Sequence, residues 1–172
     1  MGRTLDQLTV ERGPWLVAGS SLALLAGAFA FQHLGGLAPC VLCIWQRWPH
    51  AIAALLALVA GLLTPAGRGG AAAAWLMVAA GVVLLAGAGI AGFHVGVEQH
   101  WWEGTAECGT TETAASVAEL KARLLETPVA RCDEVAWSLL GISMAGWNLL
   151  LSVGLAGLSF LIARKIYGKS KP

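Results

Sequence analysis

The chain has 172 residues, of which 57% are hydrophobic and only 12% are charged, and its formal net charge is +1. With a mean hydropathy of +0.69, this composition excludes an ordinary soluble globular domain and is typical of an integral membrane protein. Eight of the ten acidic residues lie between residues 96 and 136. We therefore expect this segment to lie outside the membrane.

The first apolar segment covers residues 14–34 and starts with Pro14, which the first turn of a helix accepts because it needs no N–H donor there. A cleaved signal peptide is the alternative, since Ala28-Phe29-Ala30 has the small-x-small pattern of a cleavage site. The segment is 21 residues long, which is enough to span the hydrocarbon core. We therefore predict a retained transmembrane helix.

The second segment covers residues 41–63 and follows a short loop at 35–40. A helix that started at Pro49 would be too short to span the membrane. We therefore predict a helix that begins near Cys40 and is kinked where Pro49 removes a hydrogen bond to the carbonyl of Trp45. This start places Cys43 in the first turn.

A third segment at 71–94 and a fourth at 137–163 complete a predicted all-α bundle of four transmembrane helices in one domain. Seven of the eleven Lys and Arg residues lie in the amino tail, the loop at Arg68 and the carboxyl tail. By the positive-inside rule these segments and both termini are cytoplasmic. The loops at 35–40 and 95–136 then face outward.

The second outward loop contains a predicted short amphipathic helix at residues 116–126. Ser116 and Glu119 have the spacing of a capping box, and Val117, Leu120 and Leu124 recur at helical spacing. A helix of this kind can lie on the membrane surface.

Four cysteines form a close pair, Cys40 and Cys43, and a wide pair, Cys108 and Cys132. An even number of cysteines in outward loops suits disulfide chemistry in an oxidising compartment. Arg47 lies four residues after Cys43, where a cation on the same helix face stabilises a reactive thiolate. The close pair is therefore the candidate redox centre.

Other interpretations of these residues stay open at this point. The cysteines could form two inert structural disulfides, and Arg47 could extend to lipid headgroups. A zinc site is disfavoured because Cys108 and Cys132 lack the close spacing of a second ligand pair. We interpret three histidines as unremarkable interfacial side chains, namely His33, His50 and His94. Trp147 and Asn148 are predicted to lie about 15 Å into the fourth span.

The chain resembles the bacterial disulfide bond formation protein B family, DsbB, over nearly its whole length. The resemblance is carried by the four spans, the wide cysteine pair and these motifs: Phe31-Gln32-His33, Pro39-Cys40-Val41-Leu42-Cys43-Ile44, Arg47, Trp137, Leu140-Gly141 and Met144. It implies a multi-pass bacterial inner-membrane thiol oxidase with its active site on the periplasmic side. Its partners would be a periplasmic thioredoxin-fold oxidant similar to DsbA, the lipid bilayer and ubiquinone, with menaquinone as the other candidate. The resemblance implies neither a metal nor a nucleic acid.

The resemblance also implies a role for each motif residue. Cys108 would form the mixed disulfide with the partner, and Cys132 would be its companion. Cys40 would take electrons from the wide pair by exchange with Cys132. Cys43, as a thiolate, would contact the quinone ring, and Arg47 would stabilise the negative charge that develops there.

Two positions depart from the family pattern or match it ambiguously. Ala145 stands where relatives often have a proline, and the histidine that neighbours the quinone matches either Gln99 or His100. We include His100 among the quinone-binding candidates. Three other classes compete with DsbB: a vitamin K epoxide reductase-like enzyme, a haem protein with histidine ligands, and a non-catalytic membrane scaffold with two disulfides.

Overall fold

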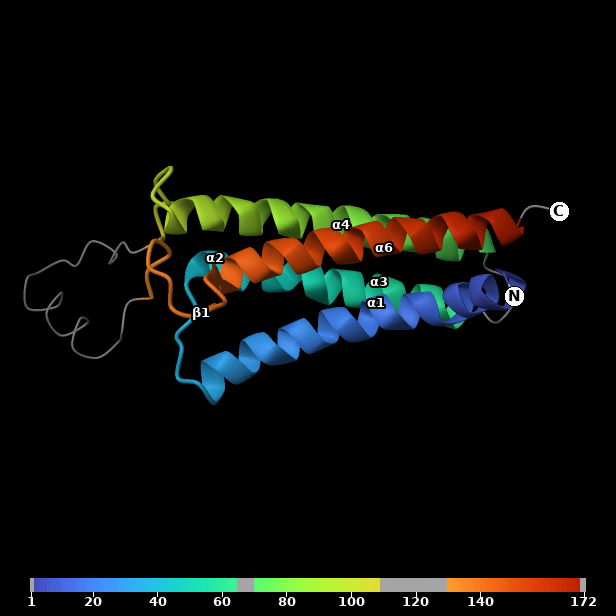
Figure 1. Cartoon of the computed structure of the whole chain (residues 1–172), viewed down its shortest axis with the longest axis horizontal. Coiled ribbons are helices and arrows are strands. Elements are labelled where there is room, and N and C mark those ends of the chain that lie inside the picture. Colours follow the sequence, from blue (N-terminus) through green and yellow to red (C-terminus); the bar gives the residue numbers. More distant parts are fainter. Residues whose placement is uncertain (1, 65–69, 109–129, 171–172) are drawn as a thin grey trace, which may run out of the picture.

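The computed structural model describes residues 2–64, 70–108 and 130–170. Figure 1 shows the long helices of the chain running side by side. In chain order the elements are α1 (Gly2–His33), α2 (Val41–Trp45), α3 (Arg47–Leu63), α4 (Gly70–Glu98), β1 (Ser138–Leu139), β2 (Ile142–Ser143) and α6 (Met144–Ser170).

Four helical segments in the described part of the chain are long and apolar enough to cross a membrane. They are Gln7–His33, Val41–Leu63, Gly70–Glu98 and Met144–Ser170. The second combines α2 and α3, as its 23 residues require for a full span. The prediction of a four-helix membrane bundle is confirmed.

Small residues bring the helices of this bundle together. Helix α4 packs against α3 and α6, and α1 packs against α3 and α6 on the other side. Ala53, Ala57 and Ala60 of α3 are buried with Ala73 and Ala80 of α4 in one core cluster. Such side chains allow backbones in lipid to approach closely, where van der Waals contact rather than water exclusion drives association.

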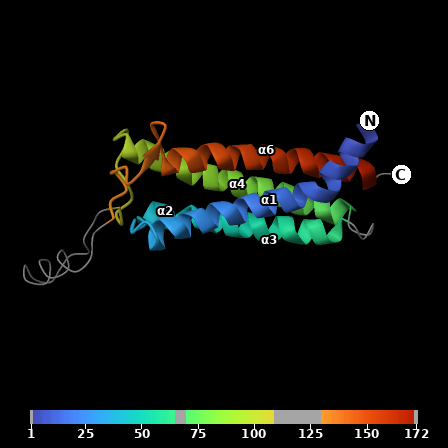
Figure 2. The same cartoon turned by 60° about the horizontal axis from the view of Figure 1, so that its bottom comes forward.

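Both chain ends lie at one end of the bundle, and α2, β1 and β2 lie at the other end (Figures 1 and 2). Four antiparallel crossings produce this arrangement. All four cysteines are therefore remote from the two termini. The predicted amphipathic helix at 116–126 lies outside the described residues.

Gly87 marks a close approach between α4 and the second span. A Cβ atom at Gly87 would lie 2.7 Å from the Cβ of Pro49, whereas one at Gly89 would have no atom of the described residues within 4 Å. We expect Gly87→Ala to lower the free energy of unfolding by about 1–3 kcal/mol because the rigid proline ring cannot move aside. The matched control Gly89→Ala should be neutral or slightly stabilising, since alanine favours helix. Unfolding in mixed detergent micelles, monitored by circular dichroism, gives the free energy of unfolding of both variants. Equal losses in the two variants would contradict this packing.

Three helix ends differ from the sequence predictions. Helix α1 does not start at Pro14 but at Gly2, and it continues through Pro14, whose side chain is buried. Helix α4 extends four residues beyond the predicted end and stops at Glu98. The second span does begin beside Cys40, and it is interrupted at Gln46, three residues before Pro49. This break agrees with the predicted loss of a hydrogen bond to Trp45.

The prediction that the fourth helix starts near residue 137 is wrong. Residues Ser138–Ser143 form a hairpin, with Ser138 opposite Ser143 and Leu139 opposite Ile142. Leu140 and Gly141 form its two-residue turn and both have positive φ, 55° and 77°, as a type I′ turn requires. The helix α6 therefore begins at Met144, and Trp147 lies in its first turn rather than deep in the span.

Candidate active site

The close cysteine pair lies at the start of the second span. Cys40 is the N-cap of α2, and its sulfur accepts a hydrogen bond from the backbone N–H of Cys43 at 3.3 Å. Cys43 is therefore in the first turn, as predicted. The two sulfur atoms are 2.8 Å apart, with Cys40 buried and Cys43 half-buried. The pKa of the Cys40 thiol is raised, mainly by the hydrogen bond with Cys43 and to a smaller extent by burial. Cys40 therefore retains the proton when the pair is reduced.

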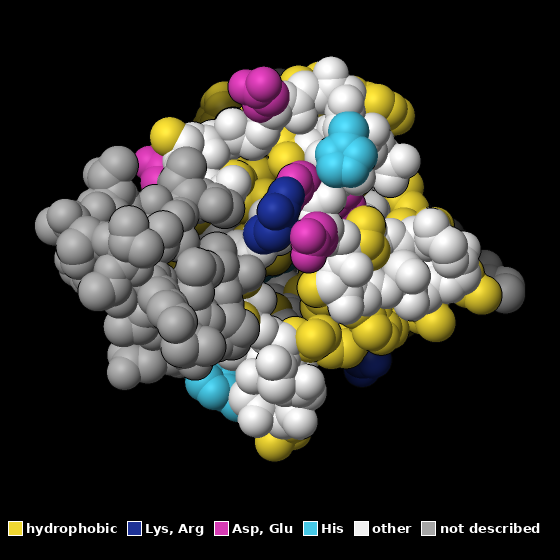
Figure 3. All heavy atoms as spheres, turned by 90° about the vertical axis from the view of Figure 1, so that its left-hand side faces the viewer, with side chains coloured by type: hydrophobic (Ala, Val, Ile, Leu, Met, Phe, Trp, Pro, Cys, Tyr) yellow, Lys and Arg dark blue, Asp and Glu magenta, His cyan; other side chains and the backbone are white. Residues whose placement is uncertain are grey.

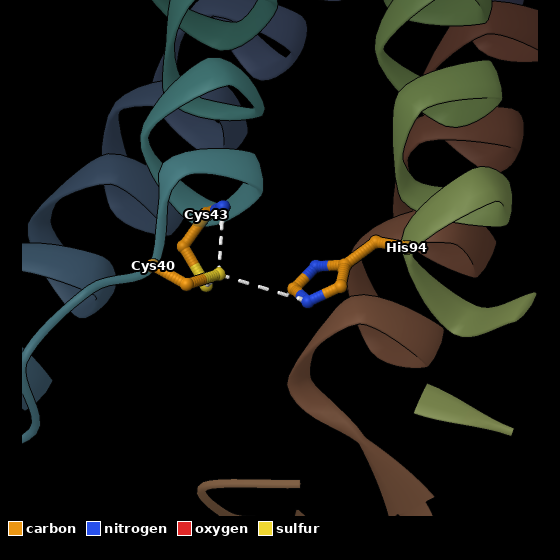
Figure 4. A group of neighbouring side chains, drawn as sticks. All are labelled: Cys40, Cys43 and His94. Carbon is orange, nitrogen blue, oxygen red and sulfur yellow. Dashed lines mark hydrogen bonds between the residues drawn. The ribbon is translucent and has the colours of Figure 1, made fainter. Parts of the chain in front are cut away.

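His94 of α4 points toward this pair (Figure 4). Its Nε2 atom is 3.7 Å from the sulfur of Cys40. The three side chains place their donor atoms within 4.8 Å of one another. Two thiolates on one tetrahedral zinc ion lie about 3.8 Å apart, given Zn–S bonds of about 2.3 Å. The 2.8 Å sulfur separation fits a dithiol that closes a disulfide better than it fits a zinc site.

The wide pair forms a disulfide in this structure. Cys108 and Cys132 are bonded, with their Cα atoms 5.2 Å apart. Cys132 is fully buried and packs in one cluster with Cys40, Leu42 and Val97. The two cysteine pairs, remote in sequence, are therefore neighbours in space. Disulfide exchange requires this proximity, because one sulfur must attack the other directly.

A cavity of about 390 Å³ opens beside the close pair. Cys40, Cys43 and Arg47 line it, together with apolar side chains of α1 and α6. The Arg47 guanidinium donates to Gln32 Oε1 at 2.7 Å and lies 4.8 Å from the centre of the Phe29 ring. Its Nε atom is buried without a partner in the described residues. This arrangement holds Arg47 in the cavity wall, where an acceptor atom of a ligand would satisfy Nε.

Several polar residues of the site were missed by the sequence analysis. The interpretation of His50 and His94 as interfacial is wrong, because both are only 4% exposed and hydrogen-bonded inside the bundle. Gln46 and Asn148 join them, with Asn148 Nδ2 donating to Gln46 Oε1 at 2.5 Å. Glu98 lines the same cavity and accepts a hydrogen bond from the Ser143 hydroxyl. Polar side chains within apolar spans are the signal that could have identified them.

His100 lies away from the cavity that contains the close pair. It is exposed, has a φ of 57°, and lines a second cavity with Trp101, Cys108 and Asp133. The structure thus places His100 beside the wide pair. The residues of α4 that line the cavity of the close pair are His94 and Glu98.

Charged side chains of both signs gather at the end of the molecule that carries the cysteines (Figure 3). Next to Cys132, Arg131 pairs with Asp133 at 2.5 Å and with Glu134 at 3.2 Å. The hydrogen bond from Arg131 lowers the pKa of the Asp133 carboxyl, which stays ionised at neutral pH. These exposed pairs contribute little to stability, but they give the surface around the wide pair a polar character.

Comparisons with known proteins agree with this geometry. The model of the family described as "Disulfide bond formation protein DsbB" matches residues 11–162. A disulfide bond formation protein B of Methylococcus capsulatus is 40% identical over 144 residues, covering 81% of this chain and 85% of the relative. The protein of that name from Dechloromonas aromatica is 33% identical over 150 residues, covering 82% and 84%, and that from Aromatoleum aromaticum is 36% identical over 163 residues, covering 83% and 89%. No solved structure matches the chain significantly. With a family match over most of its length and both cysteine pairs in one packed cluster, the chain belongs to the DsbB family of membrane proteins of disulfide bond formation.

Proposed function

We propose that this protein is a protein-dithiol:quinone oxidoreductase of the bacterial inner membrane. It would oxidise a periplasmic thioredoxin-fold dithiol similar to DsbA and pass the electrons to ubiquinone or menaquinone. The observation that carries the proposal is the packing of both cysteine pairs in one cluster, beside an apolar cavity that Arg47 lines. An inert scaffold with two structural disulfides would need neither this packing nor the cavity.

Electrons would enter at the wide pair. A thiolate of the partner attacks the sulfur of Cys108, breaks its bond to Cys132 and leaves Cys132 as a thiolate. Cys132 then attacks Cys40 and releases Cys43 as a thiolate. The partner's second thiolate then breaks the bond between the partner and Cys108, so that the partner leaves with a disulfide and Cys108 becomes a thiolate. Attack of Cys108 on Cys132 re-forms the Cys108–Cys132 bond, releases Cys40 and leaves the close pair with two additional electrons.

The lining of the cavity supports a quinone as the electron acceptor. A bound quinone would accept two electrons and two protons, which the reduced close pair and the surrounding solvent provide. Cys43 is half-buried in the cavity wall, and Arg47 offers a carbonyl oxygen its Nε atom, which has no partner among the residues that the structure describes. A fixed guanidinium stabilises negative charge that develops on such an oxygen. Apolar residues from α1 and α6, among them Phe31 and Leu151, complete the wall.

The orientation in the membrane follows from the basic residues. Seven of the eleven Lys and Arg residues lie in the two tails and the loop at Arg68, which the positive-inside rule places in the cytoplasm. Both termini lie at the end of the bundle opposite the cysteines. The active site would then face the periplasm, where the partner is found.

The absorbance of oxidised quinone tests the function. Purified protein in detergent is mixed with ubiquinone-1 and a reduced thioredoxin-fold dithiol, and the quinone absorbance is followed over time. We expect the absorbance to fall while the partner acquires a disulfide, one per quinone reduced. A boiled sample and a sample without the partner serve as controls. Absence of quinone reduction with intact partner and quinone would favour a disulfide-bonded scaffold.

A further inference from the structure

A row of hydrogen-bonded side chains leads from Cys40 into the bundle. His94 Nε2 faces the Cys40 sulfur at 3.7 Å, and His94 Nδ1 lies 2.8 Å from Gln46 Nε2. Gln46 Oε1 accepts from Asn148 Nδ2 at 2.5 Å, and Asn148 Oδ1 lies 2.8 Å from His50 Nε2. Three helices and the break between α2 and α3 contribute to this row, so its formation depends on the whole bundle.

One backbone carbonyl determines which side chain is the donor in the hydrogen bond between Gln46 and His94. Gln46 Nε2 also donates to the carbonyl oxygen of Leu42 at 3.1 Å. If the amide nitrogen and oxygen of Gln46 were exchanged, Oε1 would face that carbonyl oxygen, and two acceptors would be in contact. The second N–H of Gln46 therefore donates to Nδ1 of His94. A neutral imidazole that accepts at Nδ1 carries its hydrogen on Nε2. That hydrogen points at the sulfur of Cys40.

We propose that His94 is a catalytic residue that donates a hydrogen bond from Nε2 to the sulfur of Cys40 and so stabilises the Cys40 thiolate. Gln46 and Asn148 are positioning residues that hold His94 in this tautomer. The inference rests on the proposed function, since it assigns the role to a step of the exchange between the two cysteine pairs. Cys132 lies in the same buried cluster as Cys40, which places His94 close to where the two pairs meet.

The step that uses this hydrogen bond is the release of Cys40. After Cys132 has attacked Cys40, the two are joined in a mixed disulfide and Cys43 is free. The second thiolate of the partner attacks the partner's sulfur in its mixed disulfide with Cys108, which forms the partner's disulfide and releases Cys108 as a thiolate. Cys108 then attacks Cys132. The Cys108–Cys132 bond forms, the Cys40–Cys132 bond breaks, and the electron pair of the broken bond stays on Cys40. Exchange is faster when the leaving sulfur is a better stabilised thiolate.

Burial makes Cys40 a poorer leaving group, because it destabilises the thiolate. Its thiol has a raised pKa because of the hydrogen bond with Cys43 and because of burial, so without a donor it would be a poor leaving group. His94 provides that donor at short range. The titratable and charged groups that line the cavity around Cys40 are Cys43, Arg47 and His50 of the second span, His94 and Glu98 of α4, and Arg131 and Glu134 of the outer loop.

The alkylation rate of Cys40 tests the proposal without partner or quinone. Full-length protein with Cys43→Ser is reacted with iodoacetamide across a pH series, and modification of the Cys40 peptide is quantified by mass spectrometry. Because hydrogen bonds to charged groups are among the strong ones, adding His94→Leu is expected to slow alkylation at neutral pH about tenfold or more and to shift the profile to higher pH. His94→Gln, which keeps an amide N–H near the Nε2 position, should stay within about threefold of the parent. An unchanged profile in His94→Leu overturns the proposal.

The tautomer provides a second measurement, which does not depend on the alkylation of any variant. Protein labelled with ¹⁵N at the histidine rings should show His94 with a protonated Nε2 and an unprotonated Nδ1 at neutral pH. Gln46→Met removes the donor to Nδ1 and should give a mixture of tautomers. A wild-type His94 with its hydrogen on Nδ1 overturns the proposal.

These results separate the inference from the function on which it rests. A His94→Leu protein with an unchanged alkylation profile and full quinone reduction would refute only the role of His94. A wild-type protein that reduces no quinone, with the expected profile and tautomer, would refute only the proposed function.

Discussion

Quinone reduction is expected to disappear in Cys43→Ala whichever dithiol supplies the electrons, with a loss of about 10³-fold or more. Cys43 is the member of the close pair that is half-exposed in the cavity wall, while Cys40 is buried. Without the Cys43 sulfur the close pair cannot form a disulfide, so it cannot accept electrons from the wide pair. The measurement is the initial rate of quinone absorbance loss with a reduced thioredoxin-fold partner and, separately, with dithiothreitol.

The matched variant is the double replacement Cys108→Ala with Cys132→Ala. It removes the entry point for a protein dithiol and leaves no loop thiol that could trap Cys40. We expect it to lose activity with the protein partner as completely as Cys43→Ala does. With dithiothreitol it should keep activity, because a small dithiol can reach the close pair through the cavity. Loss of both activities in the double variant would mean that the wide pair also maintains the site structurally.

The sequence was sufficient to predict the bundle and the position of the close pair within it. Apolar length alone locates four spans, and the need for about 20 spanning residues places the start of the second span at Cys40 rather than at Pro49. That argument also predicts Cys43 in the first turn, which the structure confirms. These features depend on local composition and on geometry along one helix.

The rest of the site depends on contacts between segments remote in sequence. Gln46 meets His94 and Asn148 across 48 and 102 residues, and hydropathy does not indicate which face of a span points inward. The hairpin at 138–143 is short and apolar, so it reads as the start of a helix unless the turn at Leu140-Gly141 is recognised. Correcting that start also moves Asn148 from mid-span to the level of the close pair.

Arg47→Leu is expected to slow quinone reduction by about 10² to 10³-fold, the loss typical of removing one charged donor from a developing negative charge. The guanidinium is held by Gln32 and Phe29 of α1, and its Nε atom has no partner among the described residues. An arginine held this way within a span carries a desolvation cost that a functional role would explain. Initial rates over a range of quinone concentrations should show a raised KM together with a lowered kcat.

Two further variants determine which property of Arg47 matters. Arg47→Lys keeps the charge but lacks Nε and the planar fork, so it should recover only part of the rate. Gln32→Leu leaves the guanidinium intact but removes its anchor, and we expect a smaller loss, about tenfold or less. In all three variants the reduced partner should still reduce the Cys108–Cys132 disulfide at the wild-type rate when quinone is omitted, because Arg47 lies on the cavity side of the close pair. If Arg47→Leu instead reduces quinone as fast as wild type, the side chain serves only to hold α1 against the second span, and the acceptor must bind against other residues of the cavity.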